Sequence, residues 1–152
     1  MKPHLWFICG AIMAALAVVN GAFAAHGLRQ NLAQRYVELT SKNMSDFDFD
    51  ELIKKRLGDF ETGARYQMYH AFALMLIGLA AARKPSKVWS AAGVCFFFGI
   101  LLFSGCLYAL VLTNRTWLGA VVPIGGSLFI VGWVLAAIAG RKLAVPEQAI
   151  AT

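Results

Sequence analysis

Apolar residues fall into four long stretches along the chain, and polar links separate these stretches. A bilayer core about 30 Å thick requires roughly 20 mostly apolar residues from each helix that crosses it, and each stretch is near or above that length. We therefore predict an all-α protein, an integral membrane four-helix bundle that forms a single membrane domain. The predicted spans cover about residues 5–28, 63–82, 88–112 and 117–139, with an extramembrane loop at 29–60.

The loop after the first span carries the pattern of two short helices. Apolar residues recur on one helix face at Leu28, Leu32, Tyr36 and Leu39. This pattern is typical of an amphipathic helix at a membrane interface. Further along, acidic residues at 46–51 precede basic residues at 54–56 and then Gly58. That order of charges favours a short helix that ends at Gly58, because the charges at its two ends oppose the helix dipole.

The alternating acids of this loop also raise the question of a calcium site. An EF-hand loop that starts at Asp46 requires glycine at its sixth position and glutamate at its twelfth. The chain has Glu51 and Leu57 at those positions. We therefore expect a solvated acidic face there rather than a cation site.

Composition agrees with a membrane location. Of the 152 residues, 59% are hydrophobic and only 14% are charged, whereas soluble domains carry about 25% charged residues. The net charge of +6 lies mostly beside the apolar stretches, where basic residues set topology and contact anionic lipid. This placement argues against nucleic-acid binding. The three cysteines all lie in apolar stretches without metal-ligand spacing, so we expect no cofactor and no metal.

The N-terminal stretch has two interpretations. Ala22, Phe23 and Ala24 read as the cleavage site of a signal peptide, but the apolar character continues to Leu28. We favour a retained first span. Four spans then place both termini on one side, where short basic segments such as 83–87 adjoin helix ends. The number of Lys and Arg residues on each side does not decide the orientation. Because the positive-inside rule applies best to such short segments, we expect both termini in the cytoplasm and the long loop outside.

Polar residues inside the spans are costly and therefore informative. Counting about 1.5 Å per residue from the loop-side ends predicts one shared depth for Asn20, His70, Ser104 and the segment 123–126. The polar cluster as a whole comprises Asn20, His26, Glu61, Arg65, Tyr66, Gln67, Tyr69, His70, Ser104 and Tyr108. Its members lie in the loop-side half of the membrane, whereas the other half is nearly all apolar.

Several contacts are expected within this cluster. Glu61 and Arg65 stand one helical turn apart and are expected to form an ion pair. The two ring nitrogens of His70 require partners, for which Tyr66, Asn20, Ser104 or a backbone carbonyl freed near Pro123 are candidates. The tryptophans at positions 89, 117 and 133 suit the aromatic belts at the membrane interfaces.

The cluster admits four interpretations. The first is interhelical hydrogen bonding, which contributes about 0.6 kcal/mol per bond in lipid. The second is a small cavity open to the loop side that binds a small ligand, a lipid headgroup or a proton. A metal site at His26 and His70 lacks a third ligand. A hydrolase using Ser104 and His70 lacks an orienting acid and an oxyanion site, so we assign no catalytic residue.

Small residues and helix breakers mark two further features. Ala17, Gly21 and Ala25 recur every four residues, a spacing that lets a second helix approach closely in lipid. In the fourth span, the predicted helix break consists of Pro123, Gly125 and Gly126. Proline removes one backbone donor there and kinks the helix or ends its first turn.

Four segments, in order, resemble a known family: Gly21–Leu28, Phe60–Thr62 with Arg65–His70, Leu102–Gly105 with Leu107 and Tyr108, and Pro123–Gly126 with Gly132 and Trp133. The chain resembles the YgdD/YwdK-type family of small multi-span membrane proteins, a domain-of-unknown-function family with a eukaryotic small transmembrane relative. The resemblance implies the bacterial inner membrane and a retained first span, and it supplies no activity. The chain departs from the family pattern at Ala24, where glycine is common, and in a longer connection at 33–59.

Two functions remain in competition. The first is a structural or accessory bundle that stabilises a larger complex or its own oligomer, with the lipid bilayer and a membrane protein or a second copy as partners. The second is binding or transport of a small ligand, a lipid or a proton through the polar half-membrane layer. An enzyme is the least supported class, because the sequence contains no complete catalytic set.

Overall fold

The structure, a computed structural model, describes residues 2–39 and 45–143. Every regular element within these ranges is a helix, which confirms the all-α prediction. In chain order the elements are α1 (Pro3–His26), α2 (Leu28–Leu39), α3 (Asp46–Arg83), α4 (Lys87–Ile100), the π-helix η1 (Leu101–Gly105), α5 (Cys106–Thr113), the 3-10 helix η2 (Thr116–Ala120), α6 (Val122–Gly140) and the 3-10 helix η3 (Arg141–Leu143).

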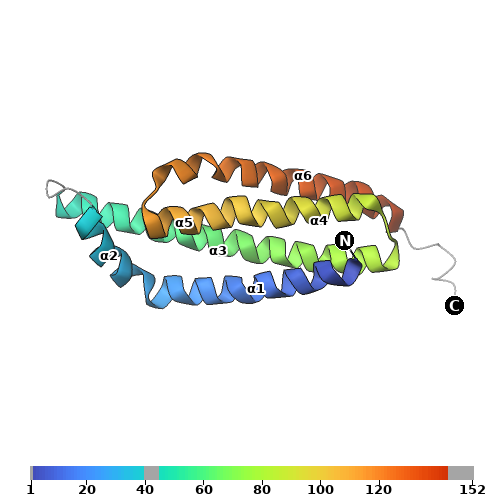
Figure 1. The fold of residues 1–152 in the computed structure, drawn as a ribbon, viewed down its shortest axis with the longest axis horizontal. Helices are drawn as coiled ribbons and strands as arrows, with labels where there is room; N and C mark the ends of the chain where they lie inside the picture. The colour runs from blue at the N-terminus through green and yellow to red at the C-terminus, as the bar shows by residue number, and fades with distance from the viewer. Residues whose placement is uncertain (1, 40–44, 144–152) are drawn as a thin grey trace.

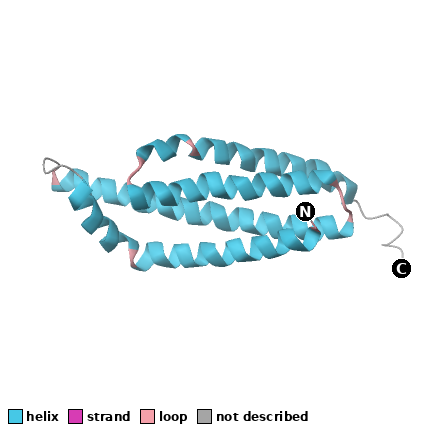
Figure 2. Ribbon diagram, viewed as in Figure 1, coloured by secondary structure: helices cyan, strands magenta, loops and turns pink. Residues whose placement is uncertain are grey.

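The long helices lie side by side in one elongated bundle. Figure 1 shows α1 and α6 on the two outer sides, with α3 and the continuous α4–η1–α5 helix between them. The N-terminus and the turn from α3 to α4 lie at one end of the bundle, called here the terminal end. The opposite end of the bundle, called here the loop end, contains α2, the start of α3 and the link from α5 to α6. Within the described ranges, Figure 2 shows only short loops between the helices.

Three helical segments are long and apolar enough to cross a membrane. Among the described residues these segments are Pro3–Val37, Lys87–Thr113 and Thr116–Gly140. α3 does not meet the same criterion, since polar residues such as Gln67, His70 and Arg83 interrupt its apolar half.

α3 is one continuous helix of 38 residues, so the prediction of a short helix ending at Gly58 is wrong. Its start agrees with the charge pattern, because Ser45 caps the first turn by accepting a hydrogen bond from the Asp48 amide. The helix continues through Gly58 because a glycine inside a helix costs only about 1 kcal/mol relative to alanine. Burial of Ile53 and Phe60 on either side of that glycine offsets the cost.

α2 packs on the protein with the apolar face that the sequence indicates. Leu28, Leu32 and Tyr36 are buried in one cluster with residues of α3 and α5, so this face contacts the bundle itself rather than a lipid interface. The side chain of Leu39 lies outside the described residues. Tyr36 donates to the Val111 carbonyl (3.0 Å). Because the last carbonyls of a helix lack intrahelical partners, α2 caps the end of α5.

The closest approach of α1 to α3 lies toward the terminal end. A Cβ at Gly10 would stand 2.6 Å from the Ala71 carbonyl oxygen, and one at Gly78 would stand 2.8 Å from the Phe7 nitrogen. Of the predicted ridge, Ala17 is buried and Ala25 is exposed. A Cβ at Gly21 would meet nothing within 4 Å. Within this chain, the expected close contact at Gly21 is therefore not made.

Candidate functional site

The structure divides the predicted polar cluster between two interfaces of α3, called here seams. One seam is with α1 and α5, and the other is with α6. Asn20, Gln67 and Tyr108 form one group, called here the Gln67 cluster. His70 forms the other with Phe129 and Trp133 of α6, called here the His70 cluster. Depth along the helices was therefore not sufficient to predict which residues meet.

Gln67 binds three helices together. Its side chain is 3% exposed. Its Oε1 accepts a short hydrogen bond from the Tyr108 hydroxyl of α5 (2.7 Å) and a longer one from the Asn20 amide of α1 (3.4 Å). Its Nε2 donates to the Met13 carbonyl of α1 (2.8 Å). A buried amide requires such partners, and here they link α1, α3 and α5.

The tyrosine of this cluster depends on a small residue beside it. A Cβ at Gly63 would stand 2.9 Å from the Tyr108 ring. The glycine therefore provides the space in which the ring lies against α3 and directs its hydroxyl at Gln67. The Phe60 ring packs on the same tyrosine, with 4.6 Å between ring centroids.

His70 has partners for both ring nitrogens. Nδ1 lies 2.8 Å from the Tyr66 carbonyl oxygen, and the Trp133 indole donates to Nε2 (3.3 Å). Because an indole N–H only donates, Nε2 must accept, and Nδ1 carries the proton toward the carbonyl. The imidazole is therefore in its neutral form. The predicted partners Asn20, Ser104 and the Pro123 region do not bond to His70. Its partner on α6 is Trp133, which the sequence analysis assigned to an aromatic belt.

Aromatic stacking holds the His70 ring. The rings of His70 and Phe129 lie 3.4 Å apart between centroids at an angle of 6°. The Tyr66 ring is nearly parallel to both, at 21° to His70 and 27° to Phe129. His70 of α3 and Phe129 of α6 thus form a stacked pair, and the Tyr66 ring lies beside this pair with its centroid 6.1 Å from that of His70.

The predicted helix break lies at the junction of η2 and α6. Pro123 stands in the first turn of α6, where its missing N–H removes no intrahelical bond. Gly125 faces η1 so closely that an added Cβ would overlap the Phe103 backbone nitrogen, whereas a Cβ at Gly126 would stand 3.8 Å from the Phe103 ring. Gly125 therefore permits backbone contact between α6 and the π-helix.

Ser104 lies within η1 and is fully buried. Among the described residues its hydroxyl has no hydrogen-bond partner, so it joins neither cluster. The π-helix itself was not predicted. π-turns within α-helices often occur at functional sites, but the neighbouring residues 100–106 carry no compositional signal for one.

The remaining predicted residues lie on the outer surface. His26 is exposed at the end of α1, and Glu61, Arg65 and Tyr69 are exposed on α3. Glu61 and Arg65 form no ion pair with each other in the part of the chain that the structure describes, which corrects that expectation. Both are exposed, and an exposed pair gains little from contact. The described residues also contain no group of three or more His, Cys, Asp or Glu suited to a metal.

Sequence analysis missed Arg56, which fixes the link between α5 and α6. Its guanidinium is almost buried, lies 3.5 Å from Asp59, and donates to the Asn114 side-chain oxygen (3.2 Å). Asn114 has a left-handed backbone (φ 54°), a conformation that asparagine tolerates better than most residues. A basic residue three positions before an acid in the extramembrane loop was the available signal.

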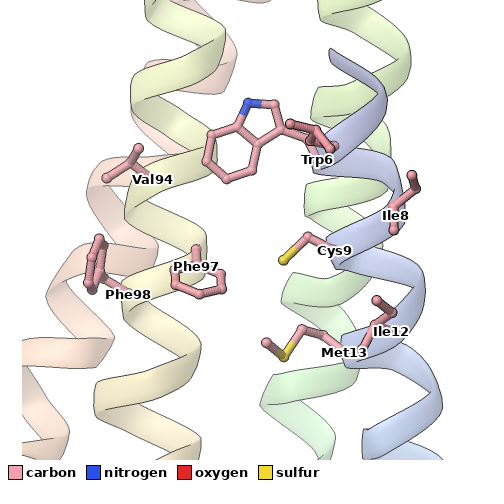
Figure 3. Close-up of a pocket in the computed structure, with 9 residues that line it drawn as sticks. Trp6, Ile8, Cys9, Ile12, Met13, Val94, Phe97 and Phe98 are labelled. Atoms are coloured by element: carbon pink, nitrogen blue, oxygen red, sulfur yellow. The ribbon is translucent and has the colours of Figure 1, made fainter. Parts of the chain in front are cut away.

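Grooves lie between the helices on the outer surface of the bundle, and two of them are lined mostly by apolar and aromatic residues. One, of about 570 Å³, lies between α1 and α4 near the terminal end. Figure 3 shows Cys9 and Met13 directed from α1 toward Phe97 of α4. The other, called here the α3–α6 groove, has a volume of about 730 Å³, and the His70 cluster forms part of its wall.

Comparison with known proteins gives one consistent result. The family "Protein of unknown function (DUF423)" matches residues 20–126. A "UPF0382 membrane protein" of Staphylococcus epidermidis is 40% identical over 141 residues, which cover 92% of this chain and 98% of the relative. The "UPF0382 membrane protein YwdK" of Bacillus subtilis is 37% identical over 140 residues, covering 91% and 97%.

No solved structure matches the chain. The matched residues include the whole Gln67 cluster, His70 without its α6 partners Phe129 and Trp133, and the start of α6. The family resemblance inferred from the four sequence segments is confirmed. The chain belongs to the DUF423 family and is similar over nearly its whole length to UPF0382 membrane proteins, a family of unknown function.

Proposed function

We propose that the chain is a four-span integral protein of the bacterial inner membrane with a structural or accessory role rather than an enzymatic one. Its relatives are bacterial proteins named as membrane proteins. Helical spans, rather than the β-barrels of outer membranes, favour the inner membrane. Basic residues in the short turn at 83–87 support a cytoplasmic location for the terminal end.

The path of the chain supports α3 as the fourth span. α1 ends at the loop end with His26, and α4 begins at the terminal end with Lys87. If both helices cross the bilayer, the segment between them must cross it as well. Residues 63–82 of α3 have a length of about 30 Å as a helix, which equals the thickness of the bilayer core.

The burial of Gln67 and His70 accounts for the low hydropathy of this span. Both side chains lie inside the bundle, at 3% and 5% exposure, so they contact neighbouring helices rather than lipid. Ionisable and polar residues in spans are tolerated when they face the bundle interior and are paired. The polarity of α3 is therefore compatible with a crossing helix.

One observation supports the structural role: the buried polar side chains of α3 form their hydrogen bonds within this chain. The hydrogen-bonding atoms of Gln67 and both nitrogens of His70 have partners on other helices or on α3 itself. Such bonds specify how helices pack in lipid. A shared water-filled cavity reaching Asn20 and His70 has less support, because these residues lie on different seams.

Gly21 offers a direct test of the accessory role, with a membrane protein or a second copy as partner. A side chain there meets nothing within 4 Å in this chain, so Gly21→Leu should leave the bundle intact and obstruct a helix that packs on α1. Gly58→Leu is the matched control, since its site is equally open but lies in the part of α3 that precedes the proposed span.

The measurement is native gel electrophoresis of gently solubilised membranes. We expect the unsubstituted chain to migrate as a complex larger than one chain. Gly21→Leu should release the single chain, whereas Gly58→Leu and His70→Ala should retain the complex. Migration of the unsubstituted protein as a single chain, or a complex that survives Gly21→Leu, would contradict the accessory role.

A further inference from the structure

The α3–α6 groove lies on the lipid-facing surface near the loop end. Tyr66 and Tyr69 of α3 form one wall, and the first half of α6 forms the other. From Pro123 to Trp133 the α6 wall extends about 15 Å along the helix. Pro123, Ile130 and Trp133 of this wall are exposed, so a molecule dissolved in the bilayer can enter the groove from the side.

The groove offers flat aromatic surfaces to its contents. Tyr66 is 39% exposed, and its ring lies beside the stacked pair of His70 and Phe129, 6.1 Å and 6.4 Å from their ring centroids. The Phe103 ring lies 4.8 Å from it at an angle of 30°. A planar ring of similar size can stack on an exposed aromatic ring, whereas a flexible acyl chain gains less from it.

The polar groups of the groove are neutral. None of the described residues that line it is Asp, Glu, Lys or Arg, and the His70 nitrogens are engaged within the protein. The hydroxyls of Tyr66 and Tyr69 have no hydrogen-bond partner among the described residues. The groove therefore suits an uncharged ligand that accepts hydrogen bonds, and it disfavours the charged headgroup of a phospholipid.

An apolar stripe continues from the groove toward the terminal end. Ile130, Val134 and Ile138 are spaced by one helical turn on α6, and all are at least half exposed. Residues four apart lie on one helix face. A hydrocarbon tail that leaves the groove can thus follow α6 into the bilayer.

We propose that the α3–α6 groove binds a quinone with a hydrocarbon tail. The quinone ring stacks on the Tyr66 ring, a carbonyl oxygen accepts a hydrogen bond from the Tyr69 hydroxyl, and its tail follows Ile130 and Val134. A quinone is flat, uncharged and an acceptor of hydrogen bonds. The proposal goes beyond the structural role and concerns binding alone.

The test is a titration of the purified full-length protein in phospholipid nanodiscs with a decyl-substituted benzoquinone. Trp133 lines the groove, so bound quinone should quench its fluorescence in a saturable manner, and Trp133→Phe should remove that component. Tyr66→Leu removes the stacking ring and should weaken binding about tenfold. Gly126→Leu should block the groove from the α6 side. Tyr108→Phe is the matched control, because its hydroxyl bonds to Gln67 outside the groove.

Saturable quenching that is weakened in Tyr66→Leu, lost in Gly126→Leu and kept in Tyr108→Phe supports the quinone site. The proposal is overturned if the unsubstituted protein shows no saturable component, or if Gly126→Leu binds as well as the unsubstituted protein. Equal displacement by decanol, which has the tail without the ring, would identify an acyl-chain groove instead and would also overturn it. None of these results depends on whether Gly21→Leu changes assembly, so the two proposals fail independently.

Discussion

The two outer helices of the bundle, α1 and α6, are attached by different kinds of contact. α1 is joined to α3 and α5 by directional hydrogen bonds at Gln67. α6 packs on α4 and η1 mainly by shape, with the Phe129 ring seated over Gly99 and the η1 backbone against Gly125. The bond from Trp133 to His70 adds one polar link to α3.

The two kinds of contact predict different effects of substitutions on stability. Hydrogen bonds between helices in lipid are individually weak, so a polar seam loses stability in steps as bonds are removed. A seam built on backbone contact tolerates no added volume, because the backbone cannot move aside as a side chain does. We therefore expect small additions to disturb α6 more than small deletions disturb α1.

Gly125→Ala should have the largest effect. The added Cβ would overlap the Phe103 backbone nitrogen, and overpacking of this kind costs about 3 kcal/mol. The free energy of unfolding, measured by denaturant titration in mixed micelles, should fall by that amount. Gly126→Ala, with 3.8 Å to the nearest ring, should have little effect. Equal stability of the two variants would mean that α6 does not depend on this backbone contact.

Gln67→Leu should have the next largest effect. It removes three hydrogen bonds among α1, α3 and α5, which together contribute about 2 kcal/mol in lipid. Gln30→Leu is the matched control, because Gln30 is exposed on α2. The same titration measures both. If Gln67→Leu lowers the free energy of unfolding no more than Gln30→Leu does, the hydrogen bonds of Gln67 do not stabilise the packing of α1.

Tyr108→Phe should have the smallest effect of the three. It removes one short bond to Gln67 and should lower the free energy of unfolding by about 1 kcal/mol. Tyr69→Phe deletes a hydroxyl that has no partner among the described residues and should leave stability unchanged. If the two variants lose stability equally, the hydroxyl of Tyr108 contributes no specific bond.

The start of α3 could be predicted from sequence, whereas its length could not. Ser45 and the acids after it are local signals for a helix N-terminus. The continuation through Gly58 depends on the burial of Ile53 and Phe60 against α2 and α5. Local propensity contains no information about such tertiary contacts.

The polar residues could be identified from sequence, but their partners could not. Counting residues gives depth along a helix and does not give the rotation of one helix relative to another. Gln67 and His70 are only three positions apart, yet they meet different outer helices. The Met13 carbonyl, as a backbone atom, has no sequence signal at all.

The most direct test of the account asks whether α3 crosses the membrane. Single cysteines replace Lys54, near the start of α3, and Lys87, after its end, in a chain whose native cysteines are changed to alanine. Both positions are exposed, and a membrane-impermeant thiol reagent is applied to intact and to inverted vesicles. The account predicts that the two cysteines react from opposite sides of the membrane, with position 87 on the cytoplasmic side. Reaction of both from the same side would contradict the four-span arrangement.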